Sequence, residues 1–80
     1  MIHPGTRAGS NCTLRHGVTI GERRDGAGVP VLQEDVELGA YAQVLGPVTV
    51  GRAAKVGALA LVIRDVPPHA TVKAPAAEID

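Results

Sequence analysis

Residues 44–62 read VLGPVTVGRAAKVGALALV, and every sixth residue of this stretch, starting with Val44, is a valine. The same step extends along the chain. Its positions, here called the first slot, are aliphatic except for Gly26: Ile2, Ala8, Leu14, Ile20, Gly26, Leu32, Leu38, Val44, Val50, Val56 and Val62. Four residues further on, the fifth slot holds small or β-branched residues except at Arg24 and Pro30. A six-residue internal repeat therefore organises the sequence.

This step excludes an amphipathic helix, because six residues turn a helix through about 600° and would scatter the aliphatic side chains. A hexapeptide pattern rich in glycine and β-branched residues is typical of a parallel β-helix, in which three hexapeptides form one triangular coil. We therefore predict a single all-β domain of about three coils. Large rings do not stack in so narrow an interior, which explains the absence of Phe and Trp. Tyr41 lies in neither inward slot and is expected outside.

Two segments interrupt the repeat. Residues 22–31 contain charges followed by glycine-rich sequence, and we interpret them as a loop that protrudes from the coil before Leu32 resumes the repeat. Pro67 and Pro68 open a tail. The ladder is expected to end there, because proline donates no backbone hydrogen bond. The predicted organisation is a β-helix over residues 1–66 and a tail over residues 67–80.

Composition argues against several classes of function. Eight Lys and Arg balance eight Asp and Glu, so nothing favours nucleic-acid binding electrostatically, and aromatic residues that stack on bases are missing. The longest apolar run, residues 56–63, is far shorter than the ~20 residues that cross a bilayer. We expect no membrane span and no signal peptide. Cys12 is the single cysteine, which predicts a reducing, cytoplasmic location without cysteine-based zinc sites.

Four stretches resemble hexapeptide-repeat acyltransferases, and most closely the serine O-acetyltransferases. They are IHPGT at residues 2–6, NCTLRHGVTIG at residues 11–21, AYAQVLGPVTVG at residues 40–51 and DVPPHA at residues 65–70. The resemblance runs in the same order along essentially the whole chain. It implies a left-handed parallel β-helix, a homotrimer, and acetyl-CoA bound in a groove between neighbouring subunits. The repeat is specific for the fold and leaves the acceptor substrate open.

His16 is the candidate general base. Acyl transfer to a hydroxyl needs a base that titrates near the working pH, which favours histidine, and the third slot of His16 lies at an outward corner. The family's catalytic histidine also follows an aliphatic residue by two positions. The chain departs from the family pattern at Arg15, where Asp is usual, and at residues 28–30, which lack the family's loop histidine. Alternatively, residues 11–21 match the coil that follows the catalytic one, and the catalytic coil is absent.

Other residues are candidates for substrate binding. Arg23 and Arg24 in the loop would pair with an acceptor carboxylate, since guanidinium groups bind carboxylates bidentately, or are simply solvated charges. The resemblance implies a CoA groove lined by Gly57, Ala58, Ala60, Lys73 and Pro75. Lys73 would replace the cofactor-binding arginine of the family tail. The spacings between the three histidines of the sequence match no metal site, so no metal is expected.

The sequence thus predicts an acetyl-CoA-dependent O-acetyltransferase of the serine acetyltransferase type, acting in cysteine biosynthesis as a homotrimer. His16 would deprotonate the hydroxyl of serine or of another small acceptor. The rival hypothesis is a catalytically impaired, shortened hexapeptide protein that serves as a trimeric structural or interaction module. Acetylation of a sugar or antibiotic hydroxyl is a third possibility. None of these readings involves nucleic acid or a membrane.

Overall fold

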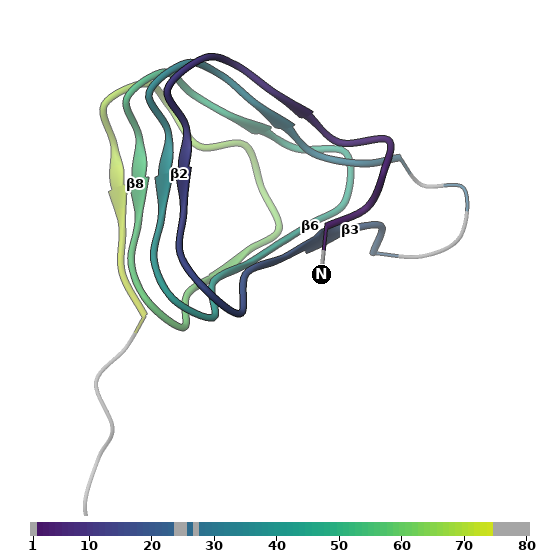
Figure 1. The fold of residues 1–80 in the computed structure, drawn as a ribbon. Helices are drawn as coiled ribbons and strands as arrows, with labels where there is room; N and C mark the ends of the chain where they lie inside the picture. Colours follow the sequence, from purple (N-terminus) through teal and green to yellow (C-terminus); the bar gives the residue numbers. More distant parts are fainter. Residues whose placement is uncertain (1, 24–25, 27, 75–80) are drawn as a thin grey trace, which may run out of the picture.

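The computed structural model describes residues 2–23, 26 and 28–74, and these form a parallel β-helix (Figure 1). In Figure 1 the N-terminal coil lies nearest the viewer and the chain turns anticlockwise as it recedes, so the helix is left-handed, as expected. The strands of the described part are short: β1 Arg7–Ala8, β2 Thr13–Leu14, β3 Thr19–Gly21, β4 Val31–Leu32, β5 Glu37–Leu38, β6 Gln43–Leu45, β7 Thr49–Val50, β8 Lys55–Val56, β9 Leu61–Val62 and β10 Thr71–Val72.

The strands form three parallel sheets, one on each side of a triangular prism. We call them face A (β3-β6-β9), face B (β1-β4-β7) and face C (β2-β5-β8-β10). Strands β1–β9 make the three predicted coils. Isolated parallel bridges extend two faces, from Ile2 to Ile20 on face A and from Val50 to Val66 on face B. Each face therefore carries four rungs within the described residues.

The first and fifth slots supply the interior, as the repeat predicts. The buried core residues are Val18, Ile20, Leu32, Val36, Leu38, Ala42, Val44, Val48, Val50, Ala54, Val56, Ala60, Val62 and Val66. Residues of the same slot stack on one another in successive coils, so that Leu32 pairs with Val50 and Leu38 with Val56. Tyr41 lies outside, with 54% of its surface exposed. The core is thus a single column of aliphatic layers stacked coil upon coil.

The strand register between successive coils shows where residues are added to or removed from the regular repeat. Val31 pairs with Thr49, an offset of three hexapeptides, which is one regular coil. Arg7 pairs with Val31 at an offset of four hexapeptides, because the segment between β3 and β4 adds one. The offset between Lys55 and Thr71 falls short of three hexapeptides. The loop therefore enlarges one coil by a whole repeat, whereas the last coil is slightly shortened.

The prediction that the double proline ends the ladder was wrong. β10 pairs with β8 beyond Pro67 and Pro68, so the paired structure continues past the predicted boundary at Val66. The prolines are tolerated because they lie in the bend between the Val66 bridge and β10, where a ladder hydrogen bond is not required of them. His69, at the same bend, donates its backbone N–H to the carbonyl of Arg52 at 2.8 Å and keeps the coils in register.

Two corners of the prism place residues in the left-handed region of φ. Corner 1, between faces B and C, stacks Asn11, Asp35, Ala53 and His69, with φ between 59° and 62°. Corner 2, between faces C and A, stacks Gly17, Tyr41 and Leu59, with φ between 60° and 73°. This region is costly for bulky residues. Hydrogen bonds hold them there, because Tyr41 donates to the carbonyl of His16 and Leu59 to that of Ala40, both at 3.0 Å.

No helix in the described part of the chain is long and apolar enough to cross a membrane.

Candidate functional site

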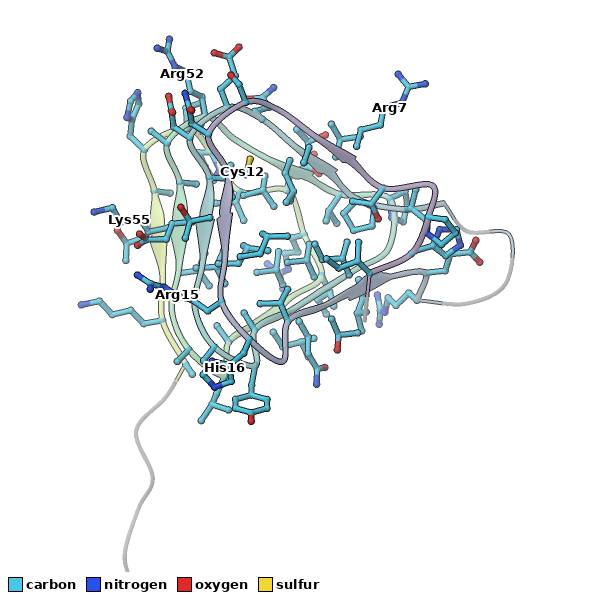
Figure 2. All side chains as sticks on the ribbon, in the orientation of Figure 1. Arg7, Cys12, Arg15, His16, Arg52 and Lys55 are labelled. Atoms are coloured by element: carbon cyan, nitrogen blue, oxygen red, sulfur yellow. The ribbon has the colours of Figure 1, made fainter. Side chains whose placement is uncertain are left out.

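His16 lies where the first coil turns from face C to face A, one residue before Gly17 of corner 2. Its side chain is exposed and points away from the prism, at a different corner from Arg52 (Figure 2). The backbone on both sides of it is fixed by the next coil, because Arg15 donates to the carbonyl of Leu38 at 3.0 Å and the carbonyl of His16 accepts from Tyr41. The predicted outward corner position of His16 is therefore confirmed.

The imidazole of His16 contacts the ring of Tyr41. The two ring centroids lie 5.2 Å apart and the ring planes meet at 85°, an edge-to-face arrangement. No carboxylate of the described residues makes a hydrogen bond or ion pair with this imidazole. The described acids lie elsewhere, at or beside the other two corners and at the start of β5: Glu22, Glu34, Asp35, Glu37 and Asp65. A carboxylate partner for His16 would therefore have to come from outside the described residues of this chain or from a second chain.

The described residues among the predicted CoA-binding set lie at the same corner, further along the axis of the β-helix. Ala58 is exposed and occupies the corner two coils after His16, a separation of about 10 Å at the usual strand spacing. Gly57 donates its N–H to the carbonyl of Val72 at 2.7 Å, which brings Lys73 beside it. Ala60 is only 2% exposed and faces the core, so only its backbone is near the surface. Pro75 lies outside the described residues.

Arg23 lies at the far end of face A from His16. Its side chain runs beside Gly46, which follows β6, whereas Tyr41 and His16 lie before the start of that strand. The stretch from Tyr41 to Gly46 spans about 16 Å in an extended conformation. One chain therefore does not bring Arg23 and His16 together. Arg24 lies outside the described residues.

A second polar group, which the sequence did not indicate, joins the N-terminus to the loop. Nε2 of His3 lies 3.3 Å from Oε1 of Glu22, and Nδ1 accepts the backbone N–H of Gly5 at 2.9 Å. Oε2 of Glu22 accepts the N–H of Gly26 at 3.0 Å. Both imidazole nitrogens of His3 have partners, so this side chain links the N-terminal segment to the start of the loop. The two partners are distant in the sequence, and the bridge of Ile2 to Ile20 brings them together.

The described residues contain no group of three His, Cys, Asp or Glu side chains placed to hold a metal ion. Cys12 is partly buried against the core, and its thiol donates to the carbonyl of Gln33 at 3.2 Å.

Comparisons with known proteins identify relatives of this arrangement. No family model matches the chain. The chain is 42% identical over 66 residues to a serine acetyltransferase of Bacillus pumilus, a match that covers 80% of this chain and 30% of that protein. It is 40% identical over 73 residues to WcaB of Escherichia coli, a proposed colanic acid biosynthesis acetyltransferase, covering 90% of this chain and 45% of the relative.

Solved structures give the same result. A serine acetyltransferase of Neisseria gonorrhoeae in complex with serine superimposes with a TM-score of 0.72 at 33% identity, over 88% of this chain and 37% of that one. The enzyme of Brucella abortus in complex with coenzyme A gives a TM-score of 0.77 at 30% identity, over 96% of this chain and 40% of that one. The chain spans between about a third and a half of the length of the proteins it matches. Over most of its length, this chain is therefore related to a part of the serine acetyltransferases, the hexapeptide-repeat β-helix that the sequence resembles.

Proposed function

We propose that the chain is the β-helix of an acetyl-CoA-dependent O-acetyltransferase of the serine acetyltransferase type, working in the cytoplasm in cysteine biosynthesis. The observation that carries this proposal is the collinear similarity to serine acetyltransferases, at 42% identity over 66 residues, together with the fold shared with structures solved with serine and with coenzyme A. The exposed imidazole of His16 supplies a group suited to the chemistry.

His16 acts as the general base in this proposal. Its unprotonated nitrogen accepts the proton of the serine hydroxyl as the oxygen attacks the thioester carbon of acetyl-CoA. The carbon–sulfur bond breaks, the thiolate of CoA leaves and takes up a proton, and O-acetylserine is formed. The corner position supports this role because it leaves the imidazole open to a substrate.

The site is completed by a second subunit of a homotrimer. Six large hydrophobic residues of the described chain are exposed, and four of them lie at corner 2 or in and beside β9 of face A: Tyr41, Leu59, Leu61 and Ile63. Such an apolar patch favours an interface. Arg23 and His16 lie at opposite ends of face A in one chain. A neighbouring subunit that contacts corner 2 would therefore supply the arginine for the acceptor carboxylate. It would also supply an acidic partner for His16, which has none among the described residues.

Acetyl-CoA would lie along corner 2 towards the C-terminal end. The backbone of Gly57 and the exposed Ala58 are two coils from His16, within reach of a pantetheine arm that carries the thioester to the imidazole. Lys73, beside Gly57, would bind a phosphate of the cofactor. The similarity to a Brucella abortus serine acetyltransferase that was solved in complex with coenzyme A supports the use of this cofactor.

The test is release of free CoA. Protein, acetyl-CoA and L-serine are incubated, and the thiol is followed with a chromogenic reagent. The proposal expects turnover by the wild-type protein. His16→Ala should lower the rate at least 100-fold, because general acid–base groups contribute about 10²–10⁴-fold. The matched control is His69→Ala, whose histidine is exposed on corner 1, and its rate should equal that of the wild type. No turnover, or turnover unchanged in His16→Ala, would overturn the assignment.

A trimeric interaction module without catalysis is the second candidate. The observation that favours it is the absence of a carboxylate beside His16 within the described chain. Calorimetry separates the two candidates, because an enzyme binds CoA with micromolar affinity, about −8 kcal/mol, whereas the module binds none.

The acceptor is the remaining choice. The relationship to WcaB favours a panel that includes sugar hydroxyls beside L-serine. Turnover with sugars but not with L-serine would support O-acetyl transfer and replace serine with a sugar as the acceptor.

A further inference from the structure

The general base of the proposed reaction needs an orienting contact, and within the described chain no polar side chain gives it one. Enzymes usually orient such a base through a third group. Among the described residues, the contact that the imidazole of His16 makes is the edge-to-face packing on Tyr41, with centroids 5.2 Å apart. This contact joins residues of adjacent coils that are distant in the sequence.

The backbone conformation of Tyr41 keeps this residue next to His16. Its φ of 60° lies in the left-handed region, and its N–H donates to the carbonyl of His16 itself at 3.0 Å. Ala42, the next residue, donates to the carbonyl of Gly39 at 3.1 Å and closes the turn. The backbone of Tyr41 is therefore tied to the residue that its side chain contacts.

Gly17 leaves the space that the ring occupies. It stands directly below Tyr41 in corner 2, and a methyl group built on it would overlap Cδ1 and Cε1 of the tyrosine. The ring therefore packs over the bare α-carbon of the residue after His16. On the other side, Leu59 takes the next position of the same corner. The phenol ring therefore lies over Gly17 and against the imidazole, while 54% of the residue remains exposed.

We propose that Tyr41 is a positioning residue for His16. Its ring restricts the imidazole to orientations edge-to-face with it, so that the exposed base does not sample the free rotamers of a surface histidine. The catalytic part of this inference rests on the proposed function, whereas the restriction of the side chain does not. Aromatic pairs of this geometry typically contribute enough for a two- to tenfold effect, and we expect a loss of about that size in kcat/KM without the ring.

The test compares Tyr41→Leu with Tyr41→Phe in the full chain. Phenylalanine keeps the ring and removes the hydroxyl. Leucine removes the ring, and Leu59 shows that this corner accepts leucine at a φ of 65°. Both variants are therefore expected to fold, which circular dichroism checks. His16→Ala identifies the imidazole C–H signals of His16 in a proton–carbon correlation NMR spectrum.

The NMR readout tests the contact without any activity. The ring current of Tyr41 should displace the His16 signals from those of an exposed histidine such as His69. We expect the displacement to persist in Tyr41→Phe and to vanish in Tyr41→Leu. Signals that are the same in Tyr41→Leu and the wild type would overturn the contact.

The kinetic readout tests the positioning. We expect kcat/KM to fall in Tyr41→Leu and to recover in Tyr41→Phe. Full activity in Tyr41→Leu, with the NMR displacement lost, would overturn the positioning role and leave the proposed function standing. A wild type without turnover would overturn the proposed function, and with it any catalytic meaning of Tyr41, while the NMR comparison would still decide the contact.

Discussion

Gly39→Ala tests how closely the coils of this helix approach one another. Gly39 follows β5, and a methyl group built on it would lie 2.6 Å from the backbone nitrogen of Ala58 and 2.9 Å from the carbonyl carbon of Gly57. Both atoms belong to the backbone of the next coil, so no side chain can rotate away. The coils would have to separate locally, and overpacking of this kind costs about 1–3 kcal/mol.

Gly21→Ala is the matched control. Gly21 follows the first-slot residue of its hexapeptide as Gly39 does, but a methyl group there has no atom of the described chain within 4 Å. Neither glycine has a positive φ, so alanine is allowed at both. Each substitution also restricts the unfolded chain, which stabilises the folded state by about 0.4–1 kcal/mol. Because this gain is common to both variants, the difference between them isolates the overlap with the next coil.

Urea unfolding followed by circular dichroism measures the difference. All proteins are compared at one concentration, because the stability of an oligomer depends on it. With a slope of about 1–3 kcal/mol per molar urea, an overlap of about 2 kcal/mol lowers the midpoint of Gly39→Ala by roughly 1 M relative to Gly21→Ala. Equal midpoints would refute the reasoning, because they would mean that the coils have room for the methyl group.

Three further changes follow from the structure. Leu38→Ala removes a side chain with no exposed surface and should lower the free energy of unfolding by about 2–5 kcal/mol. Val31→Ala, at a residue that is 39% exposed on face B and outside the proposed interface, should lower it far less. Similar urea midpoints for the two variants would contradict the assigned core. Asp65→Ala deletes the carboxylate that accepts the backbone N–H of Thr49, the first residue of β7, at 2.8 Å. The free energy of unfolding should fall by about 1 kcal/mol in the same urea assay. An unchanged midpoint would count against this hydrogen bond. Gly17→Ala should push the ring of Tyr41 off the neighbouring histidine, so an unchanged ring-current shift in the NMR spectrum would disprove the packing.

The first and fifth slots of the repeat were readable from sequence because they depend on local geometry. Within a hexapeptide, the strand and its corner decide which side chain faces inward, so Leu38 and Val56 could be assigned to the core and Tyr41 to the surface. The same local logic placed His16 at an outward corner. It could not separate Gly39 from Gly21, because their difference lies in the backbone of another coil.

The candidate site was only partly predictable for a similar reason. The sequence singled out His16, but it gave no sign of Tyr41 as a contact, since the two are distant in the chain and the loop between them enlarges that coil by a hexapeptide. It named both Arg23 and His16 as site residues, but it gave no sign that face A holds the two apart within one chain. It also missed the pair of His3 and Glu22, which forms only through the bridge of Ile2 to Ile20.

The sequence by itself thus determined a six-residue period, and with it the triangular β-helix, its aliphatic interior and the near absence of aromatic rings. The tertiary structure decided which residues meet between coils. Loops and corners absorb insertions and deletions, so neighbouring coils are offset by four hexapeptides, by three, or by slightly less than three. Hydrogen-bond registry across the whole ladder sets these offsets. That registry carried the ladder past Pro67 into β10 and placed Tyr41 against His16.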